Sequence, residues 1–335
     1  MRLNVILFFV FILISCISCK TKRQVPDTSN IKLNLSIQRF EKDLFSLDFE
    51  QIRDTLPYLK KKYGEFLDIF DYKVVRIGST DNPSYPDLLK GFITDYYMYE
   101  DYMKVSKTFP NLNDLQTTLT RSFKLFKYYF PKMSVPRIFT YVSGFNQSII
   151  TTDTILGISL DKYLGQSCEF YSKLELPLYL RYNMNKNKIA PDCIRAWGIT
   201  QFEMSDSASN LLSNMIYQGK ILYFTKALMP DEQDSLIIGF SKAQFDWCRK
   251  NEKNMWTYLV ENKQLFVSDY LTISKYINEG PFTKDFSRQS PARAAIWVGW
   301  QIVNKYMDRN PDITLSELMK ENNYQKILKL SKYRP

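Results

Sequence analysis

Bulky apolar residues recur every three or four positions along much of this chain. The clearest stripe contains Leu112, Leu115, Leu119, Phe123, Phe126 and Phe130, and Pro131 follows it directly. This spacing places the side chains on one face of an α-helix, so we expect a helix that ends before the proline. A second stripe with the same spacing predicts a further helical stretch and contains Leu88, Phe92, Tyr96, Tyr99 and Met103.

The pattern changes to short β-branched and aromatic runs at 137–142, 147–150 and 154–160, which predict a small sheet of two or three strands. Residues 35–40 alternate weakly and predict a first strand. Glycine is scarce, at 11 of 335 residues, whereas Tyr and Phe number 23 each. These features together predict an α+β fold that is predominantly helical with a small central β-sheet, built as a single domain over residues 35–335.

Helix signals return in the second half of the chain. Residues 211–227 predict one long helix that stops before Pro230. Ser241 with Gln244, and Thr314 with Glu317, have the spacing of capping boxes. The first box predicts a single helix that carries Phe245, Cys248, Met255, Trp256 and Leu259. Ser290 followed by Pro291 predicts an N-cap with proline at the first helical position.

The amino terminus is typical of a bacterial lipoprotein signal peptide. Arg2 precedes ten uninterrupted apolar residues, 5–14, which are too few to span a bilayer and fit a secretory signal. We therefore expect a signal peptide at 1–15, acylation of Cys16, and a tether over 16–34. Cys19 is the alternative site, but only Cys16 has a leucine, Leu13, three positions upstream. Two or three acyl chains give stable anchoring.

The formal net charge of +10 is concentrated at the two ends of the mature chain. The cations there are Lys20, Lys22, Arg23, Lys326, Lys329, Lys332 and Arg334. We interpret them as a solvated basic surface, with contact to anionic lipid or polyanionic envelope sugars as the alternative. Nucleic acid is not an expected partner for an exported lipoprotein.

The chain contains no histidine, which excludes Ser-His-Asp and Cys-His catalysis as well as HExxH zinc sites. Cys168, Cys193 and Cys248 form no CxxC pair, and we expect them to be buried and unreactive. We predict no catalytic residue, no metal ligand and no cofactor. Among the carboxylates Asp161 directly follows an apolar run, where it is either functional or a structural cap.

Five segments resemble the GldB family, the gliding-motility lipoproteins of Bacteroidota. They occur in family order at 40–45, 141–145, 158–165, 215–223 and 297–303. The resemblance implies a non-catalytic, membrane-anchored envelope lipoprotein that assembles or supports a gliding or secretion-type machinery, with envelope proteins as partners. The alternative is a carboxylate-dependent hydrolase that acts on envelope glycans.

The domain also resembles a histidine-less relative of zinc-peptidase folds. Gln218-Gly219 stands where such folds carry a Glu-Gly pair, which implies a metal site that has lost its ligands. The resemblance places a candidate functional cleft around Asp161, Tyr163, Gln218 and Lys220. In Bacteroidota lipoproteins acidic residues after the cysteine direct export to the cell surface. Basic residues follow it here, so we expect a periplasm-facing domain.

Overall fold

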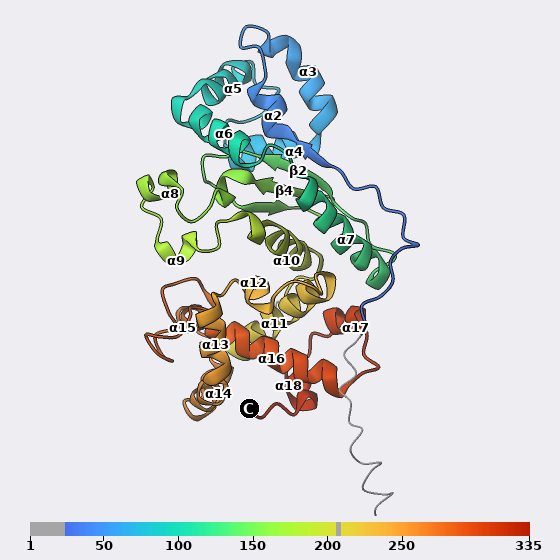
Figure 1. The fold of residues 1–335 in the computed structure, drawn as a ribbon, viewed down its shortest axis with the longest axis vertical. Helices are drawn as coiled ribbons and strands as arrows, with labels where there is room; N and C mark the ends of the chain where they lie inside the picture. Colours follow the sequence, from blue (N-terminus) through green and yellow to red (C-terminus); the bar gives the residue numbers. More distant parts are fainter. Residues whose placement is uncertain (1–23, 206–208) are drawn as a thin grey trace, which may run out of the picture.

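The computed structural model describes residues 24–205 and 209–335. Residues 1–23 lie outside the described chain, and so the predicted signal peptide, Cys16 and Cys19 are not placed. The described chain starts in the lower half of the view in Figure 1 and runs upward to the first strand. The described part contains no helix that is long and apolar enough to cross a membrane.

A four-stranded sheet lies in the upper half of the molecule, in the order β1-β2-β4-β3. Its strands are β1 (Ile37–Arg39), β2 (Arg137–Tyr141), β3 (Ile149–Thr151) and β4 (Ile155–Ser159). β1, β2 and β4 are parallel, and β3 pairs with β4 in the antiparallel sense. All five residues of β4 are buried, as expected for a parallel strand covered on both faces. The predicted small central sheet is confirmed, with the weak first strand joined to β2.

Helices from the first third of the chain cover the upper side of the sheet (Figure 1). They are α2 (Phe40–Phe45), α3 (Ile52–Tyr63), α4 (Glu65–Ile69), the π-helical turn η1 (Phe70–Val74), α5 (Tyr85–Thr94) and α6 (Tyr96–Thr108). Aromatic rings form this contact. Phe66 stacks on Phe139 of β2 with ring centroids 4.3 Å apart, and Phe40 packs edge-on against Phe66 at 5.3 Å. The abundance of phenylalanine and tyrosine is thus used in the core.

The stripe from Leu88 to Met103 does not form one buried helical face. The chain breaks at Asp95, whose carboxylate accepts hydrogen bonds from the backbone N–H groups of Tyr97 and Met98 and so caps α6. Tyr96 is 70% exposed and Met103 is 49% exposed. The buried residues of the two helices are offset from the stripe and include Leu89, Ile93 and Val105. The apolar periodicity continues across the N-cap at Asp95, and it therefore predicted the wrong buried face for the two helices.

A second helical layer lies beneath the sheet. It consists of α7 (Asn113–Tyr129), η2 (Leu160–Tyr163), α8 (Glu169–Lys173), α9 (Leu178–Arg181), η3 (Lys186–Lys188) and α10 (Ile189–Gln201). α7 is confirmed as predicted, with its inner face buried and its end just before Pro131. α10 packs against β3, β4 and α7.

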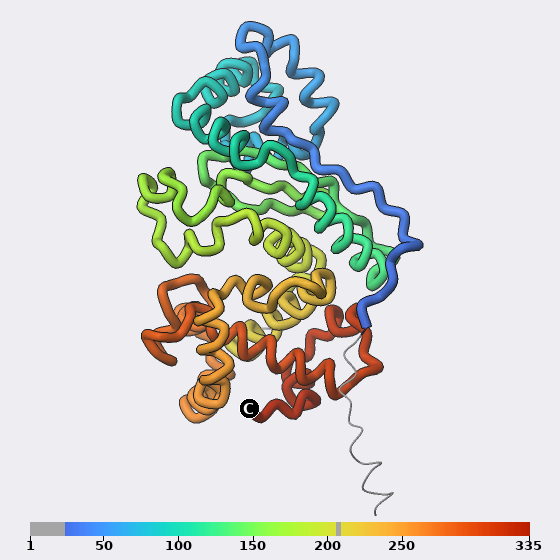
Figure 2. Tube along the Cα trace, in the orientation of Figure 1, coloured from blue at the N-terminus to red at the C-terminus, as the bar shows by residue number. Residues whose placement is uncertain are grey.

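In the lower half of the molecule the described residues form helices joined by loops, without a strand (Figure 2). It contains α11 (Leu211–Leu228), α12 (Asp234–Ile238), α13 (Lys242–Lys250), α14 (Glu252–Glu261), η4 (Gln264–Phe266), α15 (Tyr270–Ile277), α16 (Ala294–Arg309), α17 (Leu315–Lys320) and α18 (Tyr324–Ser331). α11 and α16 form its central pair. They cross at Gly219 and Gly299. The two backbones are so close there that a Cβ on Gly219 would come within 2.5 Å of the Gly299 carbonyl group.

Two predictions about helix ends in this half were wrong, whereas both capping boxes are confirmed. Ser290 is not an N-cap, because its hydroxyl bonds to the backbone carbonyls of Thr283 and Ser287 in the preceding loop. α16 begins only after Arg293, which has a left-handed φ of 59°. The helix predicted from Ser241 onward is two helices, interrupted at Asn251 between α13 and α14.

Candidate functional site

Asp161 lies buried just after the end of β4, and its carboxylate accepts several hydrogen bonds. Its Oδ2 accepts hydrogen bonds from the backbone N–H groups of Ser143 and Phe145 at 3.0 and 2.8 Å. The hydroxyls of Ser143 and Ser159 also donate to it. Phe145 has a left-handed φ of 66°, so the carboxylate holds a strained turn in place. These contacts match the structural alternative for Asp161, because four donors bind its carboxylate.

A second buried acid, Asp101 of α6, lies beside Asp161. Burial and the neighbouring Asp161 charge raise the pKa of Asp101 to about 10, so it carries a proton at neutral pH. As a carboxylate it would find no hydrogen-bond donor among the described residues, whereas as an acid it donates to Asp161. Sequence reasoning missed this residue, because nothing local distinguishes a buried aspartate from the many exposed ones.

Tyr163 belongs to a separate polar cluster at the start of α10. Its hydroxyl donates to Asp192 Oδ2 at 3.0 Å, and Lys188 Nζ donates to Asp192 Oδ1 at 2.7 Å. Lys188 is almost fully buried, and burial lowers the pKa of its ammonium group. Lys188 and Asp192 therefore neutralise each other at the junction of η3 and α10, and the hydroxyl of Tyr163 from η2 adds a neutral hydrogen bond.

Gln218 faces a cation rather than an empty metal position. Its Oε1 accepts a hydrogen bond from Nη2 of Arg195, a residue of α10, at 3.0 Å. Burial lowers the pKa of Arg195, and the nearby Arg293 charge lowers it further. Arg293 Nε in turn lies 3.0 Å from Glu279 Oε1. The two neighbouring guanidinium groups would repel a metal cation at this place.

Lys220 points to the other end of the domain. Its ammonium donates to the backbone carbonyl oxygens of Met319 and Glu321, at 3.1 and 2.7 Å. These carbonyls lie at the carboxyl end of α17, where a cation is favourable. Burial lowers the pKa of Lys220 to about 8. The contact joins α11 to α17, so Lys220 has a structural role.

The residues predicted for one cleft therefore lie in distinct settings. Asp161 and Tyr163 share η2 but bind different partners, and Gln218 and Lys220 share α11 but contact different elements. Cys168, Cys193 and Cys248 are buried, as expected, and form no disulfide. Within the described residues, His, Cys, Asp and Glu form no group of three that could hold a metal ion.

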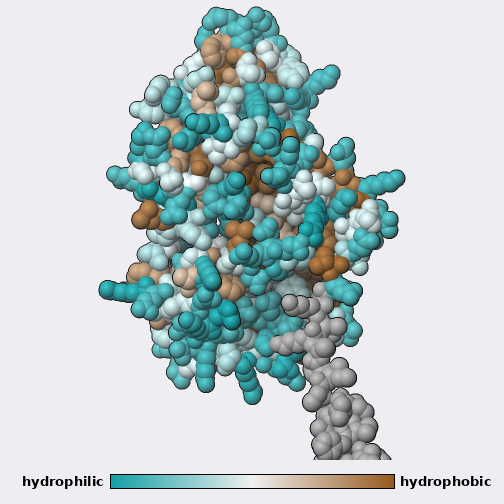
Figure 3. All heavy atoms as spheres, viewed as in Figure 1, coloured by the Kyte–Doolittle hydropathy of each residue, from teal (hydrophilic) through white to brown (hydrophobic). Residues whose placement is uncertain are grey.

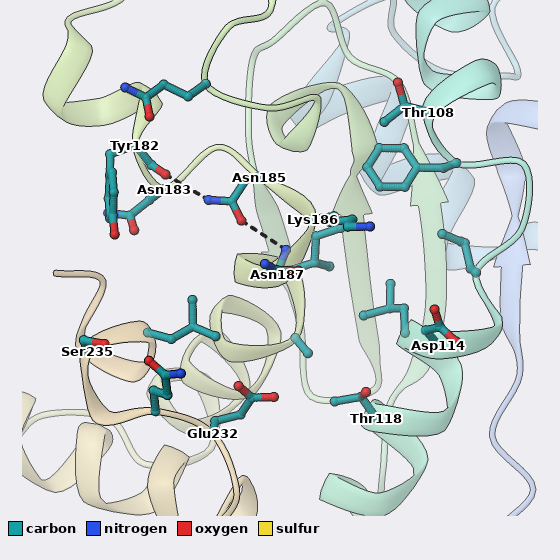
Figure 4. A pocket seen from close by; sticks show the side chains of 18 of the residues that line it. Thr108, Asp114, Thr118, Tyr182, Asn183, Asn185, Lys186, Asn187, Glu232 and Ser235 are labelled. Carbon is teal, nitrogen blue, oxygen red and sulfur yellow. Dashed lines mark hydrogen bonds between the residues drawn. The ribbon is translucent and has the colours of Figure 1, made fainter. Parts of the chain in front are cut away.

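The structure instead opens a groove of about 950 Å³ between the upper and lower halves (Figure 4). One wall is the segment from Thr108 to Thr118, which leads into α7. The opposite walls are the segment 182–190 and the residues around α12, including Glu232, Ser235 and Phe240. None of Asp161, Tyr163, Gln218 and Lys220 lines it.

Neutral polar groups dominate the lining of this groove. Asn183, Asn185 and Asn187 alternate along one wall. Asn185 fixes the wall, because its amide donates to the Tyr182 carbonyl at 2.8 Å while its Oδ1 accepts from the Asn187 N–H at 3.1 Å. A run of three asparagines at every second position is unusual in sequence, and this was the signal that could have identified the site.

Two carboxylates, Asp114 and Glu232, line the groove from different walls. Three aromatic residues, Phe109, Tyr182 and Phe240, also line the groove. A concave surface of amides, hydroxyls and rings is suited to reversible recognition of a polar partner. It offers many hydrogen bonds and few charges.

Comparison with known proteins agrees with the resemblance seen in the sequence. The family model described as gliding motility protein GldB matches residues 21–335, nearly the whole of the 335-residue sequence. Searches of curated proteins and of solved structures found no match. The zinc-peptidase architecture therefore stays a prediction, whereas the match along the chain establishes the family. This protein belongs to the GldB family of gliding motility lipoproteins, whose name implies membrane anchoring by lipid.

Proposed function

We propose that this lipoprotein acts without catalysis, as an anchored, periplasm-facing component that holds an envelope partner in its groove and so supports a gliding or secretion-type machinery. The observation that carries the proposal is the lining of the groove, where amides, hydroxyls and aromatic rings outnumber ionisable groups. The family assignment supplies the context of envelope machinery.

The charged side chains outside the groove support the same proposal. Asp161 is bound by donors, Asp192 is paired with Lys188, and Lys220 is bound to backbone carbonyls. General acid–base catalysis requires a carboxyl group that can reach a substrate proton. Asp114 and Glu232 are the carboxylates positioned in the groove, so they provide the direct test of the hydrolase alternative.

The experiment compares two double variants in a deletion strain. Asp114→Asn with Glu232→Gln removes both groove carboxylates at constant shape, and we expect wild-type complementation because only neutral contacts are needed. Asn187→Trp with Ser235→Trp fills the groove from two walls, and we expect at least a tenfold loss of the partner complex on native gels. Loss of motility or secretion should accompany it.

Both Trp sites are partly or fully exposed, so the variant should keep the thermal stability of the parent. A protein that loses function when the carboxylates become amides but tolerates the two tryptophans would instead be a carboxylate-dependent hydrolase. Equal, full complementation by both variants would show that the groove does not bind the partner.

A further inference from the structure

Four cations surround a small hollow at the lower end of the molecule. Arg309, Lys329, Lys332 and Arg334 line a space of about 550 Å³ together with Trp256, Leu328 and Tyr333. All four cations are exposed, and within the described residues none has a carboxylate within 4.0 Å. The hollow therefore concentrates positive charge that the protein itself does not neutralise.

The end of α18 builds this hollow as a fixed shape. Lys332 adopts a left-handed φ of 48°, which ends the helix and turns the chain back toward α14. Tyr333 is then buried, edge-on against Trp256 with centroids 5.2 Å apart. Its hydroxyl donates to Glu252 Oε1 at 2.8 Å, which holds the ring in place. The cations are thus arranged around a rigid aromatic wall.

The lipid anchor is tied to the same part of the molecule. The described chain begins beside α17, in the lower part of the view, and α18 lies at the lower end (Figure 1). Gln24 follows Cys16 by eight residues, and an extended residue spans at most about 3.5 Å, so the tether reaches at most about 28 Å. An acylated chain must keep this end close to the bilayer.

We propose that the hollow faces the membrane that carries the anchor and binds the phosphate groups of its anionic phospholipids. The inference rests on the lipid anchor of the proposed function and is independent of the groove. Clustered Lys and Arg are attracted to anionic headgroups, and Trp and Tyr favour the headgroup level. The lower end of the view is largely hydrophilic, which fits a surface contact rather than insertion (Figure 3).

The test uses the mature chain with Cys16→Ser and Cys19→Ser, so that acylation cannot cause binding. Sedimentation is measured with vesicles of phosphatidylethanolamine and phosphatidylglycerol at 3:1, and with phosphatidylcholine alone. We expect binding to the anionic vesicles that weakens as salt rises. Replacing all four cations of the hollow by Gln should weaken this binding at least tenfold.

The matched control carries Gln at Lys61, Lys73, Arg76 and Lys107, which are exposed in the upper half and have no ion pair among the described residues. This control has the same net charge as the variant that lacks the four cations of the hollow, and we expect it to bind the vesicles as tightly as the parent does. Equal weakening by both sets would show a general charge effect and overturn the site. If millimolar inorganic phosphate displaced the protein from the vesicles, and if the protein did not prefer anionic vesicles to phosphatidylcholine, the membrane would not be the ligand of the hollow.

Discussion

Gly299→Ala is expected to prevent this protein from folding stably. The added Cβ would lie far inside van der Waals contact distance of the Met215 carbonyl oxygen, at the point where α16 crosses α11. The obstacle is helix backbone, which cannot move aside as a flexible side chain can. We expect a loss of more than about 4 kcal/mol, at the extreme of single substitutions. The yield of soluble protein and its thermal unfolding midpoint measure the effect.

Gly91→Ala is the matched control for this substitution. Gly91 also lies in a helix, α5, but an added Cβ there would have no heavy atom within 4 Å. Alanine favours the helix over glycine by about 1 kcal/mol, so this variant should be as stable as the parent or slightly more stable. Normal folding of Gly299→Ala would mean that α11 and α16 do not cross as closely as described.

The sequence predicted correctly those elements in which the apolar residues of the pattern are also the residues that become buried. α7 and β4 are examples, because the periodicity of α7 and the apolar run of β4 coincide with the residues they bury. Two other polar signals were misread, although both capping boxes were predicted correctly. The carboxylate of Asp95 ends one helical stripe, and Ser290 bonds to a loop instead of capping a helix.

The candidate site was harder to predict than the fold, because it depends on which distant residues meet. Asp161 was singled out from its place after a strand, and that place is correct. Three of the four hydrogen bonds from serine hydroxyls and backbone N–H groups, however, come from the turn at 143–145, which no local pattern links to Asp161. The groove combines segments near residues 110, 185 and 235, so its walls meet only through tertiary packing.

Asp101→Asn is expected to stabilise the protein at neutral and alkaline pH. Asp101 is fully buried, and its pKa is raised from 3.8 to about 10 by burial and by Asp161. Above pH 4 the unfolded chain releases this proton while the folded chain keeps it. Stability therefore falls as pH rises toward 10, by up to about 1.4 kcal/mol for each pH unit. An asparagine amide donates to Asp161 without having to take up a proton.

Urea unfolding of the parent and the variant at pH 4, 7 and 9 tests this expectation. The two should be similar at pH 4, and the variant should gain on the order of a few kcal/mol by pH 7 and more by pH 9. Asp101→Ala removes the donor and leaves a cavity beside a buried carboxylate, so it should be less stable than Asp101→Asn throughout. A stability difference between parent and Asp101→Asn that stays constant from pH 4 to 9 would show that Asp101 is not protonated in the folded protein. The buried pair would then have to be held by a donor other than the acid itself.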